Sequence, residues 1–198
     1  MAINTEEVKD FFNSLAYKWD SYTPADDAIV REIFSNIGSL QNMTVLDGGC
    51  GTGFLVPYYI DSNVGDLDCI DISDEMIRVA RSKYDYDNVS FICQNILEYE
   101  AEGRYDIIVI FNAFPHLPAG RNTFEHLASL LKEDGIMTIA HSMSRESLIR
   151  HHSGVDDTVS AALPELDEFE NMTSGIFRIV KAVDTDRMFQ IIFKKASK

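Results

Sequence analysis

The sequence predicts an α/β fold, namely a doubly wound, mostly parallel seven-stranded sheet that ends in an antiparallel hairpin. Strand-like apolar runs alternate with helix-like segments as far as about residue 141, the pattern of parallel strands joined by crossover helices. A glycine-rich turn at residues 48–53 links the first strand to its helix. Near the end, two β-rich runs are separated only by residues 184–186, and so short a turn can join only antiparallel strands.

The chain begins its sheet with one strand–turn–helix–strand unit. The first strand covers residues 43–47, and a helix follows from about residue 54 to residue 60. Pro57 is tolerated there because it lies in the first helical turn. The second strand covers residues 67–72. This order is the start of a nucleotide-binding βαβ unit.

A second helix is predicted over residues 74–84. Ser73 can cap its N-terminus, and Asp74 and Glu75 suit the positive end of the helix dipole. The side chains expected to face the sheet are Met76, Ile77, Val79 and Ala80.

Three further parallel strands are predicted at residues 89–93, 105–111 and 136–140. The second of these is the most continuously apolar segment, as expected for a central strand buried on both faces. A helix over residues 121–131 precedes Gly135, which suits a tight turn.

Past residue 141 the pattern changes to a polar stretch that holds several histidines. A short acidic helix is expected over residues 163–171, followed by the two strands of the hairpin at residues 176–183 and 187–194.

The glycine turn is the most informative motif. Gly49, Gly51 and Gly53 alternate after the acid Asp47. Glycine is needed where the backbone turns tightly or touches a ligand. A dinucleotide fingerprint would place its third glycine at Phe54 instead, so the spacing argues against such a cofactor.

The pattern Asp-x-Gly-x-Gly-x-Gly resembles motif I of the class I S-adenosylmethionine (SAM) methyltransferases. The resemblance continues in motif order over residues 43–141, through TVLDGGCGTG, CIDISDEM, QNI, YDIIVIFNAFPHL and LKEDGIMTIAH. It implies the class I methyltransferase fold, in which one late strand is antiparallel, and SAM as the cofactor with S-adenosylhomocysteine (SAH) as its product.

The resemblance also implies roles for residues that close the strands. Asp71 would accept both ribose hydroxyls, and Ile72 would offer an apolar face to adenine. Asn95, with Ile96, stands where these enzymes usually carry an acid, and its amide oxygen would accept a weaker bond from the adenine amino group. Asn112 would lie where the methyl donor and the acceptor meet.

The N-terminal segment VKDFFNSLAYKWDSYT resembles the aromatic helix with which small-molecule methyltransferases of this kind often cover the cofactor. We expect residues 1–30 to form such a lid; the alternative is an amphipathic helix that closes the core. Within it, Phe11, Phe12 and Leu15 could pack on the body of the protein. The expected cofactor-binding residues are Tyr17, Trp19, Asp47, Gly49, Gly51, Gly53, Asp71, Ile72, Asn95, Ile96 and Asn112.

Two histidines follow neighbouring strands and are the candidate catalytic bases. His116 and His141 should face one pocket at the carboxyl edge of the sheet, whereas His126 lies in mid-helix and is expected to be structural. A histidine whose pKa lies near neutrality can take a proton from an acceptor.

Two other interpretations of this region stay open. The candidate bases, with His151 or His152 and an acidic residue, could instead bind a divalent metal, although their spacing matches no compact metal motif. Arg145 and Arg150 could clamp a carboxylate or phosphate on the acceptor.

Length and composition limit the function further. With 198 residues, 45% hydrophobic and 25% charged, the chain is expected to be one domain over residues 1–198. A net charge of −15 argues against nucleic acid as a partner. No apolar run reaches the roughly 20 residues of a membrane helix, and the acidic N-terminus is not a secretory signal, so we expect a cytoplasmic protein without membrane partners.

The sequence therefore predicts a SAM-dependent methyltransferase that acts on a compact small molecule. The acceptor pocket is expected from the lid, the loop after Asn112 and residues 142–172. A SAM-binding sensor or assembly protein without methyl transfer is the alternative. A nucleotide-dependent oxidoreductase is disfavoured by the glycine spacing and the terminal hairpin.

Overall fold

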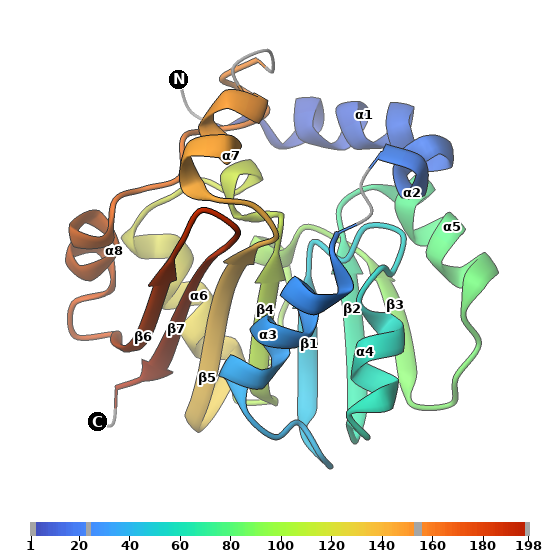
Figure 1. The fold of residues 1–198 in the computed structure, drawn as a ribbon. Helices are drawn as coiled ribbons and strands as arrows, with labels where there is room; N and C mark the ends of the chain where they lie inside the picture. Colours follow the sequence, from blue (N-terminus) through green and yellow to red (C-terminus); the bar gives the residue numbers. More distant parts are fainter. Residues whose placement is uncertain (1–2, 23–24, 153–155, 197–198) are drawn as a thin grey trace.

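The computed structural model describes residues 3–22, 25–152 and 156–196, and shows one seven-stranded sheet in the order β3-β2-β1-β4-β5-β7-β6 (Figure 1). Among these strands only β7 runs in the opposite direction, and it pairs antiparallel with β5 and β6. The strands are β1 (Thr44–Gly48), β2 (Asp66–Asp71), β3 (Val89–Cys93), β4 (Tyr105–Phe111), β5 (Leu131–His141), β6 (Phe177–Asp184) and β7 (Phe189–Lys195). The predicted fold class is confirmed.

Helices cover both faces of the sheet and its upper edge. The α-helices are α1 (Thr5–Leu15), α2 (Trp19–Tyr22), α3 (Asp27–Ile37), α4 (Val56–Asp61), α5 (Asp74–Lys83), α6 (Arg121–Leu130), α7 (Arg145–His152) and α8 (Leu166–Thr173). Single 3-10 turns are η1 (Ala16–Lys18), η2 (Ile96–Glu98) and η3 (Phe114–His116). No helix in the described part of the chain is long and apolar enough to cross a membrane.

The core has two halves, one on each face of the sheet. Alternate residues of β4 point to opposite faces and so belong to different halves. Ile107 and Val109 pack with α3 and α4, whereas Ile108 and Ile110 pack with α6 and α8. Figure 1 shows α3 and α4 in front of the sheet and α6 behind it. The sequence correctly predicts β4 as a strand buried on both faces.

The helix α5 begins as predicted. The hydroxyl of Ser73 accepts a hydrogen bond from the backbone N–H of Met76 at 3.1 Å, which caps the helix. Met76, Ile77 and Ala80 are buried, but Val79 is only half-buried, so its predicted place on the sheet-facing side is wrong. It lies on the flank of the helix, one position away from the buried stripe.

Two element starts differ from the sequence prediction for physical reasons, and one helix is additional to it. The strand β5 begins at Leu131, before the turn expected at Gly135, because residues 131–136 bulge opposite residues 105–107 of β4. The helix α8 begins at Leu166 rather than residue 163. Pro164 disfavours helical backbone at the residue before it, and Glu165 then caps the helix through a capping box. The helix α7 was not predicted, because its apolar periodicity is weak.

The N-terminal helices lie over the carboxyl ends of the parallel strands. Figure 1 shows α1 and α2 across this edge, while α3 turns down to cover the front of the sheet. Residue 30, the expected end of the lid, lies within α3, whose apolar side is buried in the core. The helical segment above the strand ends is therefore residues 5–22, called the N-terminal cover below.

Candidate functional site

A cavity of about 430 Å³ lies at the carboxyl edge of the sheet, beneath the N-terminal cover. Small-molecule and cofactor sites commonly have volumes of about 300–1,000 Å³. One face of α1 forms its roof, because Val8, Phe12 and Leu15 recur at helical spacing and all line the cavity. The ends of β1, β2, β4 and β5 form its floor, where open α/β sheets bind ligands.

The glycine turn after β1 forms one wall of this cavity. Gly49 and Gly51 have φ values of 72° and 53°, which L side chains rarely adopt. A Cβ added at Gly49 would lie 2.6 Å from the Cβ of Ala113, too close for any other residue. Gly53 does not line the cavity: a Cβ there would lie 2.9 Å from the ring of Tyr84. Gly53 is therefore packed against Tyr84, and its role as a cofactor-binding residue stays a prediction.

Asp71 ends β2 and joins it to the glycine turn. Its two carboxylate oxygens accept hydrogen bonds from the backbone N–H groups of Gly51 and Ser73, each at 2.8 Å. Burial raises the pKa of this carboxyl, an effect that the N–H groups oppose. Each carboxylate oxygen has a second lone pair, so Asp71 can also accept two ligand hydroxyls from the cavity that it lines. Ile72 lines the cavity beside it.

Asp47 is a buried acid at the end of β1, only 2% exposed, and it also lines the cavity. Burial, with the negative charge of Asp71, raises its pKa to about 8. A positively charged ligand in the cavity would favour the carboxylate form and lower this pKa.

Two asparagines line the cavity but also hold the backbone. The side-chain oxygen of Asn95 accepts from the N–H of Leu97 at 3.0 Å and so caps η2. Asn112, with φ of 52°, exchanges hydrogen bonds with Ser142 at 2.9 and 3.0 Å and ties the end of β4 to that of β5. Ile96, the residue after Asn95, also lines the cavity. Each amide can still present its remaining hydrogen-bonding capacity to a ligand.

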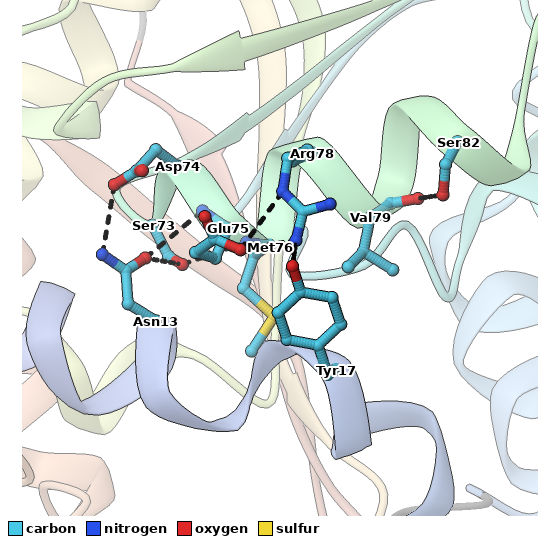
Figure 2. Close-up of polar contacts among 9 residues, drawn as sticks. All are labelled: Asn13, Tyr17, Ser73, Asp74, Glu75, Met76, Arg78, Val79 and Ser82. Carbon is cyan, nitrogen blue, oxygen red and sulfur yellow. Dashed lines mark hydrogen bonds and ion pairs between the residues drawn. The ribbon is translucent and has the colours of Figure 1, made fainter.

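The two aromatic residues expected in the lid have different positions. Trp19 lines the cavity, and a Cβ at Gly51 would lie 3.5 Å from its Nε1. Tyr17 is 73% exposed and does not line the cavity; its ring lies 4.7 Å from the Arg78 guanidinium on α5, which also donates to its hydroxyl (Figure 2). Tyr17 therefore anchors the cover from outside.

Asn13 attaches the cover to the start of α5. Its amide nitrogen donates to Asp74 at 3.1 Å, and its oxygen accepts from the Ser73 hydroxyl at 2.6 Å and the Glu75 N–H at 3.3 Å (Figure 2). Ser73 donates its backbone N–H to Asp71, so the cover and the Asp71 carboxylate share one anchor.

Asp20 attaches the cover to the glycine turn. It accepts from the Thr52 hydroxyl at 2.5 Å and forms an ion pair with Lys83 at 2.8 Å. At the start of α1, the backbone N–H of its N-cap residue Asn4 donates to the carbonyl of Thr158 at 2.7 Å. The N-terminal cover is thus held on both sides of the cavity.

The two candidate bases both line the cavity. His116, in η3, lies 2.9 Å from the carbonyl oxygen of Val159 through Nδ1, and its ring packs edge-on against Phe12 at 4.8 Å. Because a carbonyl only accepts, Nδ1 carries the hydrogen and neutral His116 has its lone pair on Nε2. His141 is fully buried at the end of β5. His126 bonds the carbonyl of Ile96 at 2.9 Å, outside the cavity.

The arginines considered as acceptor clamps are engaged elsewhere. Arg145 pairs with Glu165 at 2.6 Å, Arg150 pairs with Glu146 at 2.5 Å, and neither lines the cavity. Within residues 3–22, 25–152 and 156–196, no group of three His, Cys, Asp or Glu residues could hold a metal ion. The side chains of His151 and His152 lie outside what the structure describes.

Several lining residues were missed from the sequence. Met143 comes from the segment that follows β5, and Leu148 comes from α7, the helix whose weak periodicity concealed it. Leu117 and Pro118 follow His116 in the loop that the motif order already placed at the site. Asp20 had no signal in the sequence, since an exposed acid beside an aromatic residue is common.

Comparison with known proteins gives one family match. Residues 39–190 match the model of a family described as a methyltransferase domain. A malonyl-(acyl-carrier protein) O-methyltransferase from Ilyobacter polytropus is 29% identical over 192 residues, covering 91% of this chain and 70% of the relative. The chain spans about half the length of two other bacterial relatives of that name, 50% of one and 47% of the other.

Two solved structures share the fold. One is the methyltransferase in a complex with the Haloferax volcanii Trm112 methyltransferase activator, with a TM-score of 0.84, 16% identity, and coverage of 96% of this chain and 98% of that chain. The other is magnesium protoporphyrin IX methyltransferase from Synechocystis with bound SAH, with a TM-score of 0.73, 17% identity, and coverage of 98% and 100%.

Proposed function

Because the chain belongs to the methyltransferase domain family, with SAM as its cofactor, we propose that it is an enzyme that methylates a small molecule. The relatives' names support methyl transfer, and the limited volume of the covered cavity supports a compact acceptor. The single observation that carries the proposal is the joining of Asp71 to the glycine turn beside a covered cavity.

The lining residues suit SAM chemically. The ribose of SAM offers two adjacent hydroxyls, for which Asp71 has lone pairs available. SAM also carries two positive centres, a sulfonium and an ammonium, and the raised pKa of Asp47 marks a buried acid that a cation would stabilise as a carboxylate. Ile72, Asn95 and Ile96 would hold adenine, and Trp19 would cover the cofactor above Gly51.

The acceptor would enter the side of the cavity that holds His116 and His141. When bound, SAM supplies an electrophilic methyl group on a sulfonium. In the transfer, the acceptor's lone pair would form the bond to the methyl carbon, and the electron pair of the broken carbon–sulfur bond would stay on sulfur. The acceptor's proton passes to an imidazole nitrogen, for which Nε2 of His116 has the correct tautomer. Holding the three reacting atoms in line would contribute most of the acceleration.

The N-terminal cover acts in this proposal as a lid. Its contacts through Asn13 and Asp20 reach the elements that bind the cofactor, so closing the lid and binding SAM would favour each other. The net charge of −15 supports an acceptor other than nucleic acid.

A turnover assay tests this proposal against the alternative of a SAM-binding protein without activity. Protein is incubated with SAM that carries a deuterated methyl group and with a panel of small acceptors, and SAH and labelled products are measured by mass spectrometry. SAH formed together with a labelled product, and lost in Asp71→Ala, supports the enzyme. SAM bound at full occupancy with no labelled product from any acceptor supports the sensor.

A further inference from the structure

The acceptor side of the cavity is apolar. Besides the two histidines and Asn112, this side is lined by hydrocarbon and aromatic side chains from the cover, the loop after β4 and the segment after β5. These side chains are Val8, Phe12, Leu117, Pro118, Met143 and Leu148. Such walls bury an apolar body well but offer little to a charged group.

The charged groups that reach this cavity are all acidic. Among the described residues, no lysine or arginine lines it, whereas Asp20, Asp47 and Asp71 do. SAM itself has a net charge of one, since its carboxylate offsets its ammonium and leaves the sulfonium. With the Asp71 carboxylate beside it, the occupied cavity has no positive charge left over for an anionic acceptor.

Three basic residues on α5 and α7 are committed to other contacts. Arg145 is only 13% exposed at its side chain and is held by Glu165 and by the carbonyl of Pro164. Lys83 pairs with Asp20, and Arg78 is held by Glu75 and Tyr17. Moving one of these cations into the cavity would break contacts that hold α7 or the lid in place.

Buried anions need a cation or several hydrogen-bond donors, and an unpaired one is strongly destabilised. A neutral hydroxyl or thiol needs neither, and it gives up its proton only as the methyl bond forms. The lone pair of His116 Nε2 suits such a proton, whereas a carboxylate acceptor has none to give.

We propose that the acceptor is a neutral, mainly apolar small molecule that is methylated on a hydroxyl or thiol, and that carboxylate acceptors are rejected. This inference rests on the proposed methyltransferase function. The proposed acceptor differs from the one in the relatives' names, because a malonyl group carries a free carboxylate.

Matched probe pairs test this selectivity. SAH binding is measured first by calorimetry, and its absence would contradict the methyltransferase function itself. The SAH-loaded protein is then titrated with 4-ethylphenol against 4-ethylbenzoate, 2-naphthol against 2-naphthoate, and hexanol against hexanoate. Measurements are made at pH 8.5, above the range in which imidazole ordinarily titrates. Phenols and alcohols should bind, and each carboxylate should bind about tenfold more weakly or worse.

Two variants and a methylation arm complete the test. Met143→Lys places a cation among the lining residues and should raise carboxylate binding, whereas Ile149→Lys, exposed on α7 outside the cavity, should not. With labelled SAM, hexanol and hexanethiol, which are both neutral at pH 8.5, show which atom is methylated. Equal or tighter carboxylate binding by the wild type, or no binding of any neutral probe to SAH-loaded protein, would overturn the inference.

Discussion

The carboxylate of Asp71 accepts a hydrogen bond from the backbone N–H of Gly51 at 2.8 Å. This bond joins the end of β2 to the turn after β1, although the two residues lie 20 positions apart. The acid therefore fixes the shape of the glycine turn and faces the cavity at once. A ligand that bonds Asp71 is held against the turn that Asp71 itself supports.

SAM affinity should depend on pH through Asp47. Burial raises the pKa of its carboxyl to about 8, so without ligand the group is mostly protonated at pH 7. The positive charge of SAM favours the carboxylate, so binding should release a proton below pH 8. Affinity should therefore rise from pH 6 to pH 8 and then level off. Calorimetry in buffers of different ionisation enthalpy measures the released proton, and Asp47→Asn should abolish the release. A pH-independent affinity in the wild type would count against this role.

The N-terminal cover should close on SAM. Trp19 is the only tryptophan, and its indole nitrogen lies near Gly51, so SAM should shift or quench its fluorescence. Asn13→Ala removes three contacts to α5 and should weaken the protection of residues 5–22 from proteolysis. Ser14→Ala is the matched control, because Ser14 bonds only within its own helix. Emission and cleavage that are unchanged by saturating SAM would exclude the lid.

The rate should depend on a proton acceptor at His116. Asn in place of His116 retains a donor for the carbonyl of Val159 but lacks the lone pair at Nε2. His116→Asn should therefore bind SAM normally and methylate about 10²–10⁴-fold more slowly. The pH dependence of the rate should also change, because the proton acceptor is gone. If both His116→Asn and His141→Asn methylate at the wild-type rate across pH, neither histidine is the base and catalysis rests on positioning alone. A loss of wild-type activity with chelator would instead favour the metal alternative.

Gly49 should tolerate no side chain. Gly49→Ala places a Cβ 2.6 Å from that of Ala113 at a φ of 72°, and should destabilise the fold by about 1–3 kcal/mol and abolish SAM binding. Gly103→Ala is the matched control, since Gly103 has a φ of 62° but nothing within 4 Å of an added Cβ. The Gly103→Ala variant should be less stable than the wild type but should bind SAM with the same affinity. Equal SAM affinity in both variants would contradict the close approach at Gly49.

The sequence predicts the sheet, and predicts which strand ends come together at one cavity, for a physical reason. Strand periodicity and the glycine turn are local patterns, and the carboxyl ends of parallel strands must meet at one edge. Asp47, Gly49, Asp71 and Asn112 consequently line one cavity, as expected. Tyr17 does not, because an aromatic residue in a helix can face either way and the sequence does not fix the rotation of a short 3-10 turn.

The acceptor side was less predictable because it depends on contacts between distant segments. Leu148 reaches the cavity from α7, a helix with little apolar periodicity. Nothing local to Arg145 indicates that Glu165 holds it away from the cavity. Asp20 likewise acquires its role only when Thr52 and Lys83 are brought to it by the fold.

Calorimetric titration of the wild-type protein with SAM, alongside Asp71→Ala and the control Asp66→Ala at the exposed opposite end of β2, tests the central claim most directly. We predict micromolar SAM binding to the wild type and to Asp66→Ala, no measurable binding of NADH, and a loss of about 1–3 kcal/mol in SAM binding free energy for Asp71→Ala. Unchanged SAM affinity in a folded Asp71→Ala variant, or NADH binding as tight as SAM binding, would contradict the account.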